Sequence, residues 1–316
     1  MDQKHPSLFS IFASTKTNNI MRITALTLSF ALIAAISCNK TTKPEQESKI
    51  PIRIKSSVTK VAGDSFEKKD AIGLYVVNAN ETSEGNWSSG SLNNSGNHLD
   101  NVKFTYSDSW NADKEYYWKD SRTKADFYCY FPFKDNVTDV ENIEFTTPAD
   151  QSTLSAFKSC EILWGRSALE SPTGDFINII TTHKMSQLTI EIKPGKGFTE
   201  ESLKGSIEKV RVNNIKCHPV LNLKTGKLTA SGDMTDIAPY YDGSAYHIMV
   251  APQKLTSSTL VTLMVDGMER KLSQTIEFTS NTRKKCTITV NKLNEGINVS
   301  IGGWEDDNID YGGTLN

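Results

Sequence analysis

Short segments of alternating or β-branched residues follow one another through the second half of the chain. They recur at roughly the 8 to 12 residue spacing that is typical of a β-sandwich. These segments are Gln187 to Lys193, Glu208 to Asn213, Val220 to Leu223, Ala245 to Val250, Thr259 to Val265, Glu269 to Ile276, Cys286 to Val290 and Ile297 to Ile301. Thr225-Gly226 and Asp266-Gly267 are tight-hairpin signals, because glycine accepts a positive φ without steric cost. The pattern predicts an all-β fold.

The first half carries a similar series that is richer in aromatic residues. The predicted strands are Ile50 to Lys55, Ala71 to Val77, Val102 to Tyr106, Glu115 to Trp118 and Lys124 to Phe133. In the last of these, Phe127, Cys129 and Phe131 share one face while Tyr128 and Tyr130 share the other. Both faces are apolar, so we expect a central strand that serves as core.

Two other segments complete the expected architecture. Asn80 to Asn97 is rich in Asn, Ser and Gly and predicts a surface loop, whereas Thr199 to Gly205 predicts one short helix with Thr199 as its N-cap. The composition becomes loop-like around Ser171 to Gly174. We therefore expect two tandem β-sandwich domains, an N-terminal one over residues 50–181 and a C-terminal one over 182–316.

The stretch from Arg22 to Cys38 has the order of a secretory signal: a basic residue, an apolar run, then small residues. Its last four residues, from Ala35 to Cys38, resemble the lipobox of bacterial lipoproteins, although Ala35 stands where leucine is usual. The resemblance implies that Cys38 is lipidated; the alternative is an ordinary cysteine behind an ordinary cleavage site. We expect residues 1–37 to be removed, with Met21 as the true start, and residues 38–49 to form a tether.

The remaining features exclude several kinds of chemistry. A formal charge of −2 and a pI near 6.2 argue against nucleic-acid binding. The five histidines are scattered, C-x-x-C is absent, and S-x-x-K occurs three times without the context of a serine nucleophile. The acidic tail from Asp306 to Gly312 departs from a calcium loop in the place of its glycine. We expect no catalytic set, metal or cofactor, and we expect Cys129, Cys160, Cys217 and Cys286 to be buried and free.

Five motifs in order resemble the fimbrillin or Mfa-like lipoproteins, a family that includes subunits of type V pili. They are Ser65-Phe66-Glu67 with Asp70 and Ile72-Gly73-Leu74-Tyr75, Tyr117-Trp118 with Ala125 to Pro132, Ile162 to Gly165, His183 to Ile190, and Val299 to Trp304. The resemblance implies two transthyretin-like, Greek-key β-sandwich domains and no enzymatic activity. It also implies partners among other pilus subunits.

The resemblance further implies assembly by strand exchange after a protease removes the first strand. That strand carries Ile50, Ile52 and Ile54. The family's usual T-R-A position falls on Thr59-Lys60-Val61, so Lys60 is the candidate cleavage residue, and Arg53 is the nearby alternative. The alternative reading of Lys60 is a solvated loop lysine.

Residues for two further roles can be named. Ile309, Tyr311 and Leu315 keep strand parity and are the candidate donor strand, although Gly312-Gly313 weakens it.

Our first hypothesis is a fimbrial subunit or tip adhesin at the outer membrane. The alternative is a permanently anchored outer-membrane lipoprotein that binds a glycan or host protein, with Trp87 and Trp110 as candidate contacts.

Overall fold

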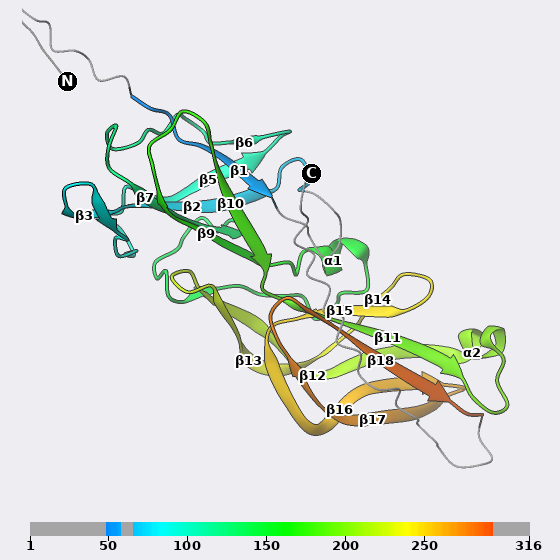
Figure 1. The fold of residues 1–316 in the computed structure, drawn as a ribbon. Helices are drawn as coiled ribbons and strands as arrows, with labels where there is room; N and C mark the ends of the chain where they lie inside the picture. Colours follow the sequence, from blue (N-terminus) through cyan, green and yellow to red (C-terminus); the bar gives the residue numbers. More distant parts are fainter. Residues whose placement is uncertain (1–48, 58–65, 293–316) are drawn as a thin grey trace, which may run out of the picture. The chain divides into compact units, whose positions relative to one another are not determined.

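A computed structural model describes residues 49–57 and 66–292 (Figure 1). These residues form 18 strands and two short helices, which confirms the all-β class. Within the described ranges, no helix has both the length and the apolar character required to cross a membrane. The described residues all fall within one compact unit of the chain. The division into two transthyretin-like domains at residue 181 stays a prediction.

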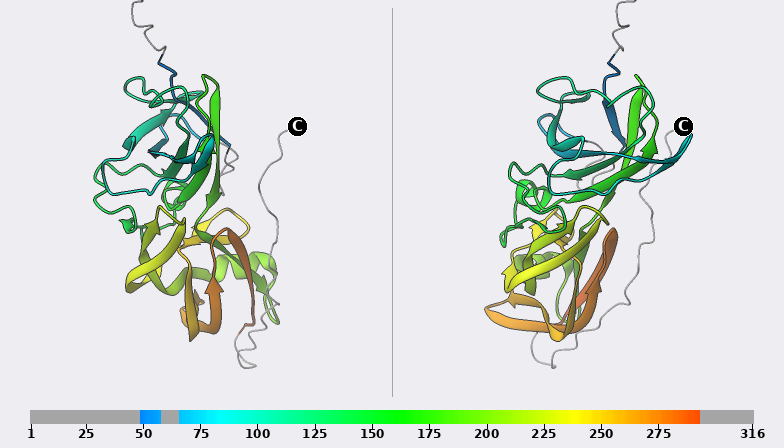
Figure 2. Two further views of the ribbon diagram at one scale, coloured as in Figure 1. Left: turned by 60° about the vertical axis from the view of Figure 1, so that its left-hand side comes forward. Right: turned by 90° about the vertical axis from the view of Figure 1, so that its left-hand side faces the viewer.

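Seven strands form the sheet of the first half (Figures 1 and 2). In spatial order they are β1 (Arg53–Ser57), β10 (Phe176–His183), β9 (Leu163–Glu170), β7 (Ala125–Phe131), β2 (Ala71–Asn78), β5 (Leu99–Tyr106) and β6 (Trp110–Asn111). All neighbours in this sheet are antiparallel except β1 and β10, which are parallel. The sheet therefore has a parallel strand at one end.

Two further sheets face each other in the second half. The four-stranded sheet has the order β14 (Tyr240–Tyr241), β15 (Tyr246–Val250), β11 (Ser186–Pro194) and β18 (Thr282–Val290). The five-stranded sheet has the order β13 (Lys227–Ile237), β12 (Ile207–Asn222), β16 (Gln253–Val265) and β17 (Met268–Phe278), with β8 (Ile143–Glu144) paired to β12. Both sheets contribute to one apolar core, in which Leu188, Ile248, Val261 and Leu263 are almost completely buried. This arrangement is a sandwich.

The central strand β7 explains how the seven-stranded sheet is stabilised on both faces. All seven of its residues are buried. Phe127, Cys129 and Phe131 belong to one apolar cluster, and Tyr128 and Tyr130 belong to another. The second cluster also includes Leu221 and Met249 and other residues from the second half of the chain. The predicted two-faced central strand is confirmed.

The two helices are short and capped. α2 (Glu200–Ser206) begins after Thr199, whose hydroxyl accepts from the backbone N–H of Ser202, so the predicted helix and N-cap are confirmed. α1 (Leu154–Lys158) begins after Thr153, which caps in the same way. The sequence pattern did not indicate α1, because a helix of five residues shows little more than one turn of periodicity.

The structure corrects three expectations for the strands. The segment Asn80 to Asn97 is not all loop, since it contains the hairpin of β3 (Asn80–Ser83) and β4 (Asn86–Ser88). The two strands predicted within Glu208 to Leu223 are parts of one strand, β12, which continues through two register shifts. Glu115 to Trp118 forms an isolated bridge instead of a strand.

Candidate functional site

The candidate site is the end of the seven-stranded sheet where β1 lies beside β10 (Figure 1). The register pairs Arg53 with Phe176 and continues without a shift to Ser57 beside Ile180. Successive residues of a strand point to opposite faces, so Ile52 and Ile54 share one face and Arg53 and Lys55 share the other. Residues 53–56 follow this period, and β1 begins three residues later than the strand expected from Ile50 to Lys55.

The inward face of this segment is buried. Ile52 is 6% exposed and Ile54 is 2% exposed, while Ile50 is partly buried against the same cluster. From β10, Ile177 and Ile179 are 3% and 0% exposed and belong to this cluster as well. Because Arg53 and Lys55 are exposed, β1 has the buried and solvated faces of an end strand.

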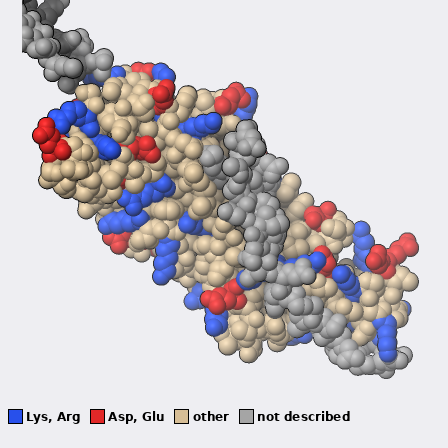
Figure 3. Space-filling view, viewed as in Figure 1, with Lys and Arg blue, Asp and Glu red and all other residues tan. Residues whose placement is uncertain are grey.

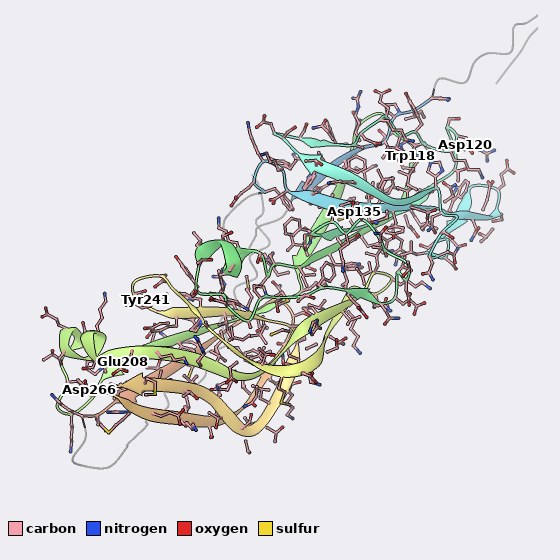
Figure 4. All side chains as sticks on the ribbon, turned by 180° about the vertical axis from the view of Figure 1, so that it is seen from behind. Trp118, Asp120, Asp135, Glu208, Tyr241 and Asp266 are labelled. Atoms are coloured by element: carbon pink, nitrogen blue, oxygen red, sulfur yellow. The ribbon has the colours of Figure 1, made fainter. Side chains whose placement is uncertain are left out.

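Residues 50–52 are also bonded on the side away from β10. The backbone N–H of Ile52 donates to the carbonyl oxygen of Tyr116 at 2.8 Å, and that of Trp118 donates to the carbonyl oxygen of Ile50 at 2.9 Å. Trp118, marked in Figure 4, is 5% exposed and packs edge-on against Phe127 with ring centroids 5.3 Å apart. The segment from Ile50 to Ser57 therefore occupies a slot in which residues 50–52 bond to Tyr116 and Trp118 and residues 53–57 pair with β10.

The segment that contains β1 covers groups that its removal would expose. Without β1, the inner faces of β10 and of Trp118 would lose their apolar cover, and the edge of β10 would present unpaired N–H and C=O groups. Burial of an isoleucine contributes about 1.5 to 3 kcal/mol. The segment that contains β1 therefore covers both apolar side chains and backbone hydrogen-bonding groups.

The residues proposed for processing are placed as follows. Arg53 lies within β1, exposed and paired to β10 through its backbone. Lys60 lies outside the described residues, as do the lipidation candidate Cys38 and the donor candidates Ile309, Tyr311 and Leu315. The structure therefore brings together the predicted first strand and its surroundings, and the other predictions stay predictions.

The two tryptophans proposed as ligand contacts have different environments. Trp87 lies on β4, half-buried, in the β3–β4 hairpin. Trp110 is 7% exposed and packs edge-on against Phe66 with ring centroids 4.7 Å apart. The ring of Trp110 thus forms part of the core, and Trp87 is the more accessible of the two.

The histidines of the described part of the chain are distributed as the sequence indicated. His183 and Glu161 form a buried pair with Nδ1 and Oε1 3.1 Å apart, and His247 contacts Asp242 with Nε2 and Oδ2 2.8 Å apart. Burial alone would raise the pKa of Asp242, but hydrogen bonds from the backbone N–H groups of Ala245 and Ser244 and from His247 hold it well below its usual range. Within residues 49–57 and 66–292, no three His, Cys, Asp or Glu side chains are grouped as metal ligands.

The cysteines of the described ranges are buried and free, as expected. They are Cys129, Cys160, Cys217 and Cys286. Burial raises the pKa of the Cys129 and Cys160 thiols to about 12 and that of Cys286 to about 11. A raised pKa keeps the thiol protonated and weakly nucleophilic at neutral pH.

The predicted turns have the expected geometry. Lys224-Thr225-Gly226 lies in the turn between β12 and β13, and Gly226 has a φ of 70°. Asp266 and Gly267 connect β16 and β17 with φ values of 51° and 70°. Near this turn, marked by Asp266 and Glu208 in Figure 4, the Glu208 carboxylate accepts from the backbone N–H of Gly267. The K-T-G sequence is therefore a hairpin turn.

One face of the described part of the chain carries mixed charge. Basic and acidic side chains are interspersed on the face seen in Figure 3. This agrees with the formal charge of −2.

Ile177 and Ile179 are the residues of the slot that the sequence analysis missed. The segment Phe176–His183 alternates strictly between exposed and buried positions. Its exposed face carries Phe176 and Ile180, which are 56% and 64% exposed. Because both faces of this strand carry apolar residues, its sequence does not show the apolar–polar alternation of a strand. Its content of β-branched residues was the signal that could have predicted a strand here.

Comparison with solved structures finds proteins that share this fold. A crystal structure from Bacteroides uniformis, of a protein provisionally assigned to cell adhesion, is 21% identical, covers 83% of this chain and 98% of that chain, and has a TM-score of 0.61. A second such structure, from Bacteroides ovatus, is 17% identical, covers 82% and 98%, and has a TM-score of 0.58. At these identities the likeness shows a shared fold.

The family follows from the sequence itself. The fimbrillin-like family matches residues 59–304, which is most of the chain. The chain therefore belongs to the fimbrillin-like family, and the predicted resemblance is confirmed. A comparison with curated proteins finds no match.

Proposed function

We propose that this protein is a fimbrial subunit or adhesin of the cell surface. It is exported as a lipoprotein precursor through Cys38 and assembles by strand exchange after its first strand is removed. Membership of the fimbrillin-like family supports the fimbrial role. The partners are other pilus subunits, and no catalytic step is required.

The observation that carries this proposal is the position of β1. It lies at the end of its sheet and pairs in parallel with β10, and the segment from Ile50 to Ser57 that contains it contributes Ile52 and Ile54 to a core otherwise built by later segments. A strand of this kind can be replaced by one from another chain without rearranging the remaining strands. Its loss would also separate the subunit from the lipid at Cys38.

Cleavage is proposed at Lys60 in preference to Arg53. The backbone of Arg53 is part of the ladder with β10, and a protease must take an extended, unpaired segment into its active site. Residues Ile309, Tyr311 and Leu315 are the proposed donor strand, since they present three apolar side chains at positions of one parity.

The test is limited proteolysis of the full chain with a trypsin-like protease, followed by N-terminal sequencing and electrophoresis. We expect a new N-terminus at Val61 and then a ladder of detergent-resistant multimers that collapses on heating. Lys60→Gln should block both, while the matched change Lys55→Gln within β1 should leave both intact. A product that stays monomeric with residues 50–60 attached would rule out this route.

A second candidate function is that of a permanently anchored lipoprotein that binds a glycan or host protein. The half-buried Trp87 on the β3–β4 hairpin favours it, because an accessible indole offers a stacking surface to a sugar ring. Binding to a glycan array that Trp87→Ala abolishes would support this function. Unchanged binding would eliminate Trp87 as the contact.

A further inference from the structure

The outer face of the five-stranded sheet carries a polar cleft. The cleft lies over β12, β13, β16 and β17, and its volume is about 350 Å³. Glu208, near the start of β12, and Asp266, directly after β16, mark this end of the sheet in Figure 4. The volume is within the range of small-molecule sites, about 300–1,000 Å³. The lining is mostly polar and includes Lys209, Arg211, Asn213, Asp236, Thr262 and Lys271.

The side chains that line the cleft alternate with core residues along each strand. On β12, Val210 and Val212 are buried in the sandwich core, so Arg211 points to the opposite face. The same period places Thr262 of β16 and Lys271 of β17 on this outer face. The register joins the three in one row, since Arg211 is paired with Thr262 and Thr262 is paired with Lys271. Two cations of the cleft therefore flank a hydroxyl group.

Two irregularities in the strand pairing shape the cleft. The register of β12 against β13 shifts between Val212 and Ile215, and Asn214 within this shift has a φ of 63°. The register of β16 against β17 shifts between Thr259 and Val261. Asn214 joins the two places, because its Nδ2 donates to the carbonyl oxygen of Thr259 at 2.9 Å. Bonds within the protein thus hold this part of the cleft in shape.

The cleft presents hydrogen-bond donors that the described part of the protein leaves unused. Arg211 is partly buried, and its Nη1 makes one long hydrogen bond, of 3.4 Å, to the carbonyl oxygen of Val210. Among the described residues, neither Arg211 nor Lys209 forms a salt bridge, although both line the same cleft as the paired Lys271. The Thr262 hydroxyl donates to Oδ1 of Asn213 at 2.8 Å, which leaves the Nδ2 group of Asn213 available as a donor. Such a surplus of donors suits an anionic ligand.

Two carboxylates in the cleft narrow the class of anion. Glu269 is paired with Lys271, with Oε2 and Nζ 2.7 Å apart. Asp236 accepts from the backbone N–H of Asn214 through Oδ1 at 3.4 Å, and its Oδ2 bonds to none of the described residues. A carboxylate repels an inorganic anion but accepts a hydrogen bond from a hydroxyl group. The lining therefore favours a ligand that carries hydroxyl groups as well as negative charge.

We propose that this cleft binds an acidic carbohydrate, a sugar chain that carries carboxylate or sulfate groups. The planar guanidinium of Arg211 binds one such group through two parallel N–H bonds, with Lys209 beside it on β12. Sugar hydroxyl groups bond to Asn213 and Asp236, which supply a donor and an acceptor.

The spacing of the cations agrees with this class of ligand. Neighbouring strands lie about 4.8 Å apart, so the Cα atoms of Arg211 and Lys271, two strands apart in one row, are about 10 Å apart. Charges this far apart match a ligand that carries its anionic groups on an extended frame. The cleft includes neither β1 nor Trp87, so the proposal is independent of strand exchange and of the β3–β4 hairpin.

The test is isothermal titration calorimetry of the full, uncleaved chain at low salt with a chondroitin sulfate hexasaccharide, which carries both uronate and sulfate groups. We expect Arg211→Gln to weaken binding about tenfold or more, because a charge-assisted bond is lost. Arg211→Lys keeps the charge but loses the two parallel bonds, so it should weaken binding less than Arg211→Gln but measurably. Asn213→Asp keeps the size of the side chain and adds a negative charge, and should also weaken binding. Lys254→Gln is the matched control, since it removes an exposed cation from β16 outside the cleft and should leave the affinity unchanged.

Four results would overturn the proposal. The first is that the hexasaccharide does not bind at low salt. The second is that Lys254→Gln weakens binding as much as Arg211→Gln, which would show a general attraction of charge. The third is that the neutral sugar chain cellohexaose binds as tightly, and the fourth is that inorganic sulfate competes as strongly as the hexasaccharide, which would show a site for simple anions. Because the uncleaved chain is used, none of these results depends on whether the protein assembles by strand exchange.

Discussion

Replacement of Ile54 by alanine tests whether β1 is held by its isoleucines. Ile54 is 2% exposed and faces a cluster that includes Ile177, its direct partner in the register. Ile→Ala changes at buried sites cost about 2–5 kcal/mol. An end strand can adjust its position, so we expect a value near the lower limit, about 2 kcal/mol.

This energy should appear first as local opening of β1. Since about 1.4 kcal/mol corresponds to a tenfold change in an equilibrium constant, a loss of about 2 kcal/mol raises the population of the opened strand about 30-fold. Hydrogen exchange of the amides of residues 53–57 measures this population directly. The neighbouring change Lys55→Ala is the control, because Lys55 is exposed in the same strand and its replacement should cost less than about 0.5 kcal/mol.

The double change Ile54→Ala with Ile177→Ala separates the contact from general loss of core volume. Side chains in contact show coupling energies of about 0.5–3 kcal/mol, whereas independent sites are additive. Two results would refute the reasoning that this contact holds β1 in its slot. The first is that amide exchange in Ile54→Ala is as slow as in Lys55→Ala. The second is that the two changes of the double variant have additive effects.

Three further predictions concern the rest of the fold. Gly226→Ala should cost about 2–4 kcal/mol in urea denaturation, because the added Cβ would lie 2.5 Å from the indole ring of Trp164. Gly267→Ala, at the same φ of 70° with open space around it, should cost only about 1–2 kcal/mol, and equal costs would contradict this reasoning. Burial raises the pKa of Cys129 from 9.0 to about 12, so this thiol should leave the free energy of unfolding unchanged below pH 9. Between pH 9 and 12 the unfolded state loses the proton and the folded state keeps it, so the free energy of unfolding should fall by up to about 1.4 kcal/mol per pH unit. Cys129→Ala should reduce this slope in denaturation measured across that range. Trp110→Ala should lower the free energy of unfolding by about 3–5 kcal/mol, and Trp87→Ala, at a half-buried position, should lower it clearly less. The opposite order would contradict the assignment of Trp110 to the core.

Local chemistry made several elements predictable from the sequence. The alternation of Ile50, Ile52 and Ile54 indicates a strand with one buried face, because side chains in a strand alternate whatever the strand pairs with. Thr199 indicates the start of α2 because its hydroxyl caps a nearby backbone N–H. Asp266-Gly267 indicates a tight turn because its backbone requires positive φ.

Contacts between distant segments were decided by the tertiary structure. Nothing in the sequence of β1 identifies β10, more than a hundred residues away, as its parallel partner. The joining of two predicted segments into β12 depends on the neighbouring strands β13 and β16, which pair with different parts of it. Trp110 also reads as an exposed aromatic in the sequence and is buried because Phe66 packs against it.

The same division applies to the candidate site. The sequence by itself determined the all-β class, the alternating pattern of Ile50, Ile52 and Ile54 and the fimbrillin-like family, because these depend on local period and on ordered motifs. Only the tertiary structure decided that this strand lies at the end of a sheet, between β10 and Tyr116–Trp118. The reason is physical: the slot consists of backbone groups and apolar side chains that come together only when strands far apart in the sequence pair.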